Sequence, residues 1–288
     1  MCKCIKLNKN NITQLKLLND SRIYFNKLNE DFFALYRSCN IFQKMFLKRD
    51  ITLLISEGKY IGYIWATMQD KNSYLINSLN IDSTSNVEKY ISLLIGTLRV
   101  GYTASYTCEG NGNNVNQLEK AGFRKISGTI KMELNLSGSY TSSINNEVMF
   151  KILEKGKEEK IRCNIQNEVF KNDTRIPISI RDIYFDQGQE YYFDDGAIFI
   201  MKDNKYMGYG QIIIENNVPI IVNLGILKDY RGKGYGKALI NYLLQIVRIN
   251  KFEKVIINVD WNNKIALEMY KKCGFKIVSE QYNMKAII

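Results

Sequence analysis

The second half of the chain alternates between two patterns of apolar residues. In one pattern, short runs rich in β-branched and aromatic residues predict strands. These runs are 197–201, 206–215, 219–226 and 254–259. In the other, apolar residues recur at helical spacing and predict helices. These stretches are 164–185, which Pro177 interrupts, 233–250 and 264–273. Strands that alternate with helices predict a mixed α/β sheet.

Three short segments of the first half recur in the same order in the second half. Segments 59–63, 91–99 and 120–125 resemble segments 205–209, 240–248 and 272–277. An ordered set of matches is typical of a diverged duplication. A polar, serine-rich stretch without apolar periodicity, 138–147, separates the copies and predicts a linker. We therefore expect domains at 1–137 and 148–288, each of an ordinary domain size.

Composition narrows the class of protein. Apolar residues make up 45% of the chain and charged residues 24%, which is typical of soluble globular proteins. No apolar run approaches the roughly 20 residues that span a bilayer, and the first residues lack the apolar region of a secretory signal. These features predict a cytoplasmic protein without a membrane partner. The sequence leaves open whether it is a monomer or a homodimer.

The chain contains no histidine, which excludes Ser-His-Asp and Cys-His catalysis and zinc sites that use imidazole. The six cysteines are scattered, so we expect free thiols and no metal. The net charge of +11 would attract a polyanion such as CoA or a nucleic acid, although a solvated basic surface also explains it. Because no local cluster interleaves Lys and Arg with aromatic residues, we do not expect a nucleic-acid partner.

The clearest chemical signal is the glycine-rich segment 231–237, R-G-K-G-Y-G-K, between a predicted strand and a predicted helix. A helix amino terminus offers unpaired N–H donors and partial positive charge. Glycines let the main chain approach an anion, and Arg231, Lys233 and Lys237 add cationic donors. The segment therefore predicts a pyrophosphate site, with a glycine-rich surface turn as the alternative. Its spacing fits neither a P-loop nor the dinucleotide-binding fingerprint.

A second motif follows about 30 residues later. Asn263, Ala266 and Tyr270 fall on one face of the predicted helix 264–273. Gly274 suits a left-handed helix end, and Phe275 would begin a core strand. Tyr270 is either a chemical group or a tyrosine of the core.

Together these motifs resemble those of the GNAT N-acetyltransferase superfamily. Segment 231–236 resembles the family's [RQ]-x-x-G-x-[GA] pyrophosphate motif, and segment 263–275 resembles its N-x-x-A-x-x-x-Y-x-x-x-G-F signature. The resemblance implies two tandem GNAT-like domains, each with a mixed, mostly antiparallel twisted sheet flanked by helices. The tandem arrangement resembles that of mycothiol synthase, which implies nothing about the acceptor.

The resemblance also implies a reaction. Acetyl-CoA would give its acetyl group to a primary amine of a small molecule or peptide, by direct attack in a ternary complex, and Tyr270 would protonate the departing thiolate. The residues that it assigns to acetyl-CoA are Leu224, Gly225, Ile226, Arg231, Gly232, Lys233, Gly234, Tyr235, Gly236, Lys237 and Asn263. A catalytically silent acyl-CoA-binding regulatory module and a basic nucleic-acid-binding protein are the alternatives.

The group that deprotonates the amine is less evident. No carboxylate lies on segment 218–223, where some family members carry a glutamate. Glu190, Glu215 and Asp260 are candidates, although each also suits an ordinary surface position, and a water chain is equally suitable. Segment 190–195 places acids beside aromatic residues and could hold a cationic amine, or it could be a solvated loop.

The first copy lacks the chemical residues of the second. At the position of the phosphate loop it reads D-S-T-S-N-V over 82–87, so that an acid replaces the arginine and the glycines are absent. Leu118 stands where the second copy has its tyrosine, whereas Asn111, Gly122 and Phe123 persist. A carboxylate would repel a pyrophosphate. We therefore expect a structural domain without a cofactor.

Overall fold

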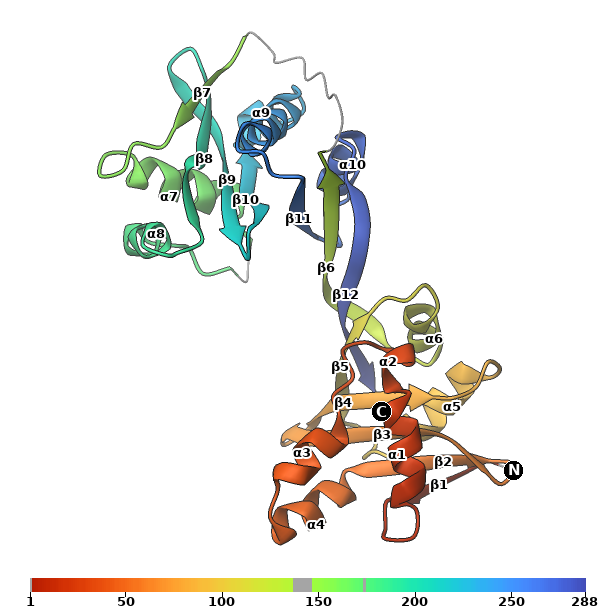
Figure 1. Cartoon of the computed structure of the whole chain (residues 1–288). Coiled ribbons are helices and arrows are strands. Elements are labelled where there is room, and N and C mark those ends of the chain that lie inside the picture. The colour runs from red at the N-terminus through yellow and green to blue at the C-terminus, as the bar shows by residue number, and fades with distance from the viewer. Residues whose placement is uncertain (1, 137–146, 173–174) are drawn as a thin grey trace. The chain divides into compact units, whose positions relative to one another are not determined.

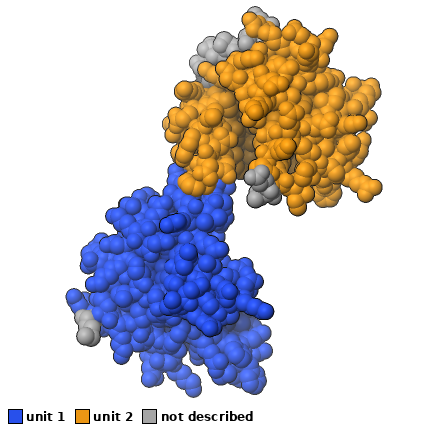
Figure 2. All heavy atoms as spheres, turned by 180° about the vertical axis from the view of Figure 1, so that it is seen from behind, with its two compact units in different colours: residues 1–129, 279–288 blue, residues 130–278 orange. Residues whose placement is uncertain are grey.

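The computed structural model describes residues 2–136, 147–172 and 175–288. The chain forms two compact units, and Figure 2 shows them in different colours. Unit 1 contains residues 1–129 and 279–288, and unit 2 contains residues 130–278. The predicted linker, 138–147, lies almost wholly outside the described residues.

Unit 1 contains a sheet with helices. In sheet order its strands are β1 (Cys2–Lys6), β2 (Ile51–Ser56), β3 (Lys59–Asp70), β4 (Ser73–Ile81), β5 (Thr103–Glu109), the end of β12 (Lys276–Ile287) and the start of β6 (Arg124–Asn135). Its helices are α1 (Ile12–Asp20), α2 (Arg22–Phe25), α3 (Phe32–Ser38), α4 (Ile41–Arg49), α5 (Val87–Ile95) and α6 (Asn114–Lys120).

Unit 2 repeats this plan. In sheet order its strands are β7 (Met149–Ile152), β8 (Tyr192–Lys202), β9 (Lys205–Glu215), β10 (Val218–Ile226), β11 (Lys254–Asp260) and the end of β6 (Arg124–Asn135). Its helices are α7 (Glu159–Val169), α8 (Ile180–Gln187), α9 (Tyr235–Ile249) and α10 (Lys264–Lys272), with a short 3-10 helix, η1, at Lys228–Tyr230. In both units the registers given are antiparallel, except for β4 with β5 and β10 with β11.

The order of elements confirms the tandem arrangement. Strand, strand, strand, helix, strand, helix and strand follow one another as β2, β3, β4, α5, β5, α6 and β6, and again as β8, β9, β10, α9, β11, α10 and β12. The predicted elements of the second half are present, and Pro177 lies between α7 and α8. The mixed α/β class is also confirmed.

The last strand of each copy does not stay with its own copy. The predicted domains place residues 130–136 in the first domain and 279–288 in the second, whereas the compact units exchange them. Strand β12 pairs with β5 from Gln281 opposite Glu109 to Ile287 opposite Thr103. Both chain ends therefore lie in unit 1, as Figure 1 shows. Each exchanged strand pairs with an edge whose main-chain groups need a partner.

Alternating side chains give unit 2 a core on each face of its sheet. From β8, Ile198 and Ile200 pack in a cluster with Leu239 and Leu243 of α9. The neighbouring Phe199 packs in a second cluster with side chains of α7. This period of two is the normal geometry of a strand, and Figure 1 shows α7 and α9 on opposite faces of the sheet. Strand β10 lies between these layers, and the candidate site begins at its end.

Candidate active site

Strand β10 changes its register halfway along. It pairs with β9 throughout, but the register shifts between Val222 and Gly225, and Asn223 has a left-handed backbone with φ of 54°. The parallel register with β11 is given for Ile220 and Ile221, before this bulge. A bulge bends the strand that contains it. The end of β10, at Leu224 and Gly225, is partly exposed as a result.

Two glycines allow the main chain to pack closely at this bend. A Cβ atom on Gly225 would lie 2.1 Å from Cγ1 of Val169 at the end of α7. A Cβ atom on Gly208 of β9 would lie 2.4 Å from the carbonyl oxygen of Gly225. Any side chain at either position would force the helix or the neighbouring strand to move. Gly225 therefore has a packing reason to be glycine, besides its predicted contact with a cofactor.

The glycine-rich loop follows η1 and leads into α9. Gly232 and Gly234 have φ of 75° and 83°, a region that side chains disfavour, so the helix begins only at Tyr235. Gly234 is the N-cap and provides no side-chain acceptor. The first N–H groups of α9 are therefore available to an anion, and residues 231–234 are exposed.

The cationic residues of the loop do not all point to solvent. Arg231 Nε donates to the Ile226 carbonyl at 2.8 Å, and its Nη2 donates to the Val169 carbonyl at 3.3 Å. Arg231 therefore ties the loop to the ends of β10 and α7. Lys233 is exposed and donates to the Asp229 carbonyl at 3.2 Å, and Lys237 is exposed in the first turn of α9. The free positive charge of the loop comes mainly from these lysines and the helix amino terminus.

Helix α10 lies against the start of α9. A Cβ atom on Gly236 would lie 3.2 Å from the Met269 sulfur, so the two helices are in contact beside the loop. Asn263 caps α10, since its Oδ1 accepts from the Ala266 N–H at 3.1 Å. Gly274, with φ of 93°, follows the end of the helix as expected for a left-handed terminator. Asn263 thus has a structural role, whatever its contact with a cofactor.

Tyr270 is both a core residue and a candidate acid. Its side chain is only 6% exposed and its ring centroid lies 6.1 Å from that of Phe275. Burial, with a smaller contribution from the thiol of Cys273, raises the pKa of Tyr270 to about 12. A phenol with this pKa stays protonated at neutral pH, as a proton donor must.

A buried polar network connects α7 and α8 with the bulge of β10. Arg162 of α7 is 1% exposed, and its Nη2 donates to Asp186 Oδ2 at 2.5 Å and to Gln211 Oε1 at 2.9 Å. Asn223, in the bulge, donates to the same Gln211 oxygen at 3.2 Å. Tyr191 donates its hydroxyl to the other Asp186 oxygen at 3.0 Å. Asp186 is therefore linked to the bend of the strand through Gln211.

Sequence reasoning missed this network. Gln211 is a polar residue inside the apolar strand segment 206–215, and it is fully buried. A buried amide requires a hydrogen-bond partner. Gln211 was therefore the residue from which a buried polar network could have been predicted. Arg162 and Asp186 lie on different helices, 24 positions apart in the sequence, and neither belongs to a recognisable sequence motif.

The three candidate bases are all on the surface. Glu190, Glu215 and Asp260 are exposed, and Asp260 accepts the Asn262 N–H at 2.8 Å, which stabilises the turn before α10. Tyr191 and Tyr192 of the predicted acceptor segment lie in the Arg162 network instead of a free loop. Burial, followed by the hydrogen bond to Asp186, raises the pKa of Tyr191.

Across residues 2–136, 147–172 and 175–288, no helix combines the length and apolar character that crossing a bilayer requires. The same residues contain no group of three or more Cys, Asp or Glu side chains placed to hold a metal ion.

Comparison with known proteins assigns the second copy to a family. A family model described as acetyltransferase (GNAT) family matches residues 154–275, which include the bulge, the loop and Tyr270. N-alpha-acetyltransferase 50 of Danio rerio is 33% identical over 132 residues, which cover 42% of this chain and 73% of that relative. The chain belongs to the GNAT acetyltransferase family. Family membership implies acyl transfer from an acyl-CoA to an amine.

Other GNAT relatives define how far the likeness extends. The chloroplastic GCN5-related N-acetyltransferase 6 of Arabidopsis thaliana is 31% identical over 123 residues, which cover 42% of this chain but only 39% of that relative. A GCN5-related N-acetyltransferase structure from Sphaerobacter thermophilus has a TM-score of 0.57 and 12% identity, and the match covers 99% of this chain and 95% of that chain. The GNAT fold therefore extends over both copies.

Proposed function

We propose that unit 2 transfers an acetyl group from acetyl-CoA to a primary amine of a small molecule or peptide. The observation that carries the proposal is the exposed amino terminus of α9, which follows two left-handed glycines at the end of a bent strand. A helix amino terminus with glycines before it suits the diphosphate of CoA.

The cofactor would lie along the end of β10 and the start of α9. The main-chain groups of Leu224, Gly225 and Ile226 would bond the pantetheine arm beyond the bulge. The amides of segment 232–236 and the ammonium groups of Lys233 and Lys237 would hold the diphosphate. Arg231 would act by fixing the loop through its bonds to Ile226 and Val169.

The reaction would proceed by direct attack. The amine nitrogen forms a bond to the thioester carbonyl carbon, the carbon–sulfur bond breaks, and the amine proton is lost to water or to a carboxylate. Tyr270 would donate its phenolic hydrogen to the sulfur as negative charge develops there. Because a phenol with a pKa of about 12 is a weaker acid than a thiol, whose pKa is roughly 8.5 for cysteine, a hydrogen bond to the thiolate should precede any proton transfer.

Asp186, which is paired with Arg162, is a partly exposed carboxylate that would contact a cationic acceptor. Its side chain is 22% exposed, and its network reaches the bulge at Asn223. Tyr191, which donates to it, lies in segment 190–195, for which the sequence left open an acceptor site or a solvated loop. Carboxylates beside phenols suit an ammonium group. Deprotonation of the amine would then fall to water or to one of the exposed acids, Glu190, Glu215 or Asp260.

Retention on a CoA affinity matrix tests the proposal. The protein should be retained, and Arg231→Glu should abolish retention, because a carboxylate would replace the group that fixes the loop and would face the diphosphate. Retention of Arg231→Glu at wild-type strength would contradict the proposal. Release of CoA from acetyl-CoA is then measured with a panel of polyamines, aminoglycosides, amino acids and peptides. Retention of the protein without any such release would indicate a silent acyl-CoA-binding module. A cytoplasmic location and a monomeric or homodimeric state stay predictions.

A further inference from the structure

Unit 1 contains a cavity where unit 2 has its loop. Strands β4 and β5 pair in parallel from Ser73 opposite Thr103 to Ile76 opposite Tyr106, and β4 then continues to Ile81. A cavity of about 270 Å³ lies beyond, between the end of β4, the start of α5 and the start of α6. These elements correspond to β10, α9 and α10 of unit 2 in the repeated order.

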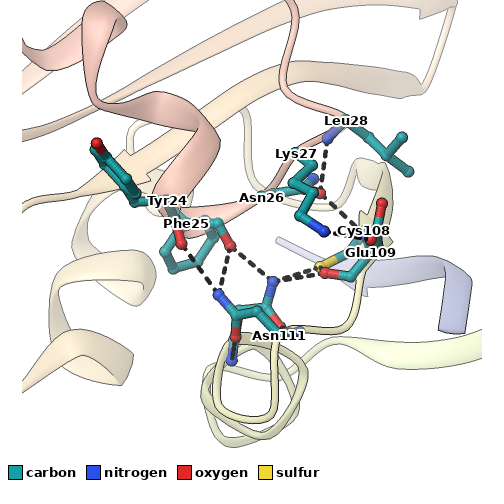
Figure 3. A network of polar contacts seen from close by, with 9 residues as sticks. Tyr24, Phe25, Asn26, Lys27, Leu28, Cys108, Glu109 and Asn111 are labelled. Carbon is teal, nitrogen blue, oxygen red and sulfur yellow. Dashed lines mark hydrogen bonds and ion pairs between the residues drawn. The ribbon is translucent and has the colours of Figure 1, made fainter. Parts of the chain in front are cut away.

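Asparagine side chains bond together the segments that line this cavity, and Figure 3 shows Asn111 bonded to Tyr24 and Phe25. Asn111 Nδ2 donates to the carbonyls of Tyr24 and Phe25 at 3.1 and 3.2 Å. Asn114 is 1% exposed and donates to the Phe25 and Glu109 carbonyls at 2.7 and 2.8 Å. The end of α2 is therefore fixed to the start of α6. The wall of the cavity is therefore fixed by hydrogen bonds between separate segments of the chain.

Three further lining residues are Asp82 and Asn113, which are exposed, and Gln117, which is half-buried. For the side chains of Asp82, Asn113 and Gln117, the described part of the chain provides no hydrogen bond or ion pair. Tyr24, which also lines the cavity, is 80% exposed. No Lys or Arg occurs among the described lining residues. The cavity thus offers one carboxylate, two amides and a phenol ring.

This chemistry is opposite to that of the loop in unit 2. Asp82 follows β4 directly, as Leu227 follows β10, and Asn86 with φ of 56° is the N-cap of α5, where Gly234 is the N-cap of α9. A diphosphate would face the Asp82 carboxylate without a compensating cation. A cation would instead meet a charge-assisted acceptor, amide oxygens and an aromatic ring.

We infer that the unit 1 cavity binds a small protonated primary amine and does not bind CoA. The volume is slightly below the roughly 300 Å³ at which ordinary ligand pockets begin, so an amine of a few carbon atoms fits. The inference does not depend on the proposed function, because it rests on the lining of unit 1 alone. If unit 2 also uses amines, unit 1 is a second site for the same chemical class. Its occupancy would then follow the concentration of free amine.

Titration of the full chain with 1,4-diaminobutane, followed by NMR of the side-chain amides of Asn113 and Gln117, tests this inference. The diamine should shift both signals, whereas its neutral analogue 1,4-butanediol at the same concentration should not. Asp82→Asn should weaken the diamine titration about tenfold, since it removes the charge and keeps the shape. Asp70→Asn, at the exposed turn between β3 and β4, is the matched control and should change the midpoint less than twofold.

Three results would overturn the inference. The first is equal shifts of the amide signals by the diamine and the diol. The second is a midpoint for Asp82→Asn equal to that of the wild type. The third is a shift of the Asn113 and Gln117 signals by CoA. The wild-type comparison of diamine with diol needs no variant, so it decides the matter even if Asp82→Asn is poorly folded. CoA retention by unit 2 is measured separately and does not depend on these signals.

Discussion

The two copies share a backbone plan at the end of their central strands but differ in the charges placed there. In unit 2 the chain passes through Gly232 and Gly234, with φ of 75° and 83°, into α9. In unit 1 it passes through Asn86, with φ of 56°, into α5. Asparagine tolerates the left-handed region better than most side chains, so the turn persists without glycine.

The difference separates what the fold requires from what the chemistry requires. Gly122 and Gly274 end the corresponding helices with φ of 98° and 93°, and Phe123 and Phe275 are both buried after them. These packing residues are the same in both copies. By contrast, the segment between β4 and α5 contains Asp82 and no arginine, and Leu118 stands in the place of Tyr270. The duplicated fold therefore tolerates the loss of the loop glycines, of Arg231 and of Tyr270.

The largest expected effect is on the residue that unit 1 lacks. Tyr270→Phe should lower kcat roughly 10²–10⁴-fold, the usual contribution of a general acid, while CoA affinity stays within about twofold. Steady-state rates of CoA release and a CoA titration measure the two quantities. Tyr242→Phe, whose ring stacks on Phe150 at 4.2 Å, is the control and should keep its rate. An unchanged kcat in Tyr270→Phe would contradict the prediction, since Tyr270 would then contribute no more to catalysis than Leu118 does in unit 1.

A smaller effect is expected at the glycine of the bent strand. Gly225→Ala should lower the free energy of unfolding by about 1–3 kcal/mol, because its Cβ would lie 2.1 Å from Val169 Cγ1. Gly110→Ala in unit 1 should cost little, since the nearest atoms to its Cβ lie at 3.7 Å. Denaturant unfolding of both variants checks this contrast. Equal stability of the two would show that α7 does not depend on this close approach.

The charge of the loop should change the affinity for CoA by about one order of magnitude. Lys233→Glu should weaken CoA binding about tenfold, which corresponds to roughly 1.4 kcal/mol. Lys251→Glu, which follows the opposite end of α9 about 22 Å away by helix rise, is the control for net charge and should change affinity less than twofold. Calorimetric titration with CoA measures both. Equal losses would mean that overall charge, and not the loop, attracts the cofactor.

The smallest effect concerns pH. An ordinary phenol is half ionised near pH 10, but the pKa of Tyr270 is raised to about 12. The phenol should therefore stay protonated as the pH rises through 10, and kcat should show no decline there from this group. The pH dependence of kcat between 8 and 11, in the wild type and in Tyr270→Phe, tests the point. A wild-type decline centred near pH 10 that is absent from the variant would contradict it.

The sequence predicted the elements of unit 2 because their signals are local. Apolar spacing marks α9, Asp203-Asn204 marks the turn between β8 and β9, and Gly274 marks the end of α10. The placement of Tyr270 on the buried face of α10 also follows from helical spacing.

What the sequence did not reveal depends on contacts between distant segments. The pairing of β12 with β5 joins residues more than 170 positions apart, and either copy would supply a strand of suitable pattern. Likewise, the side chain of Arg231 bonds the Ile226 and Val169 carbonyls, which its motif alone does not predict. The Arg162–Asp186–Gln211 network needs three separate elements to come together before its members can be recognised.

The central claim is that the amides at the start of α9 hold the diphosphate of CoA, and one titration tests it directly. Main-chain amide signals of residues 232–236 should shift strongly with CoA and only weakly with pantetheine, which has no diphosphate, while those of residues 83–87 in unit 1 stay unchanged. CoA should also bind at least about tenfold more tightly than pantetheine. Equal affinities, with amide signals of 232–236 that do not respond to CoA, would contradict the account.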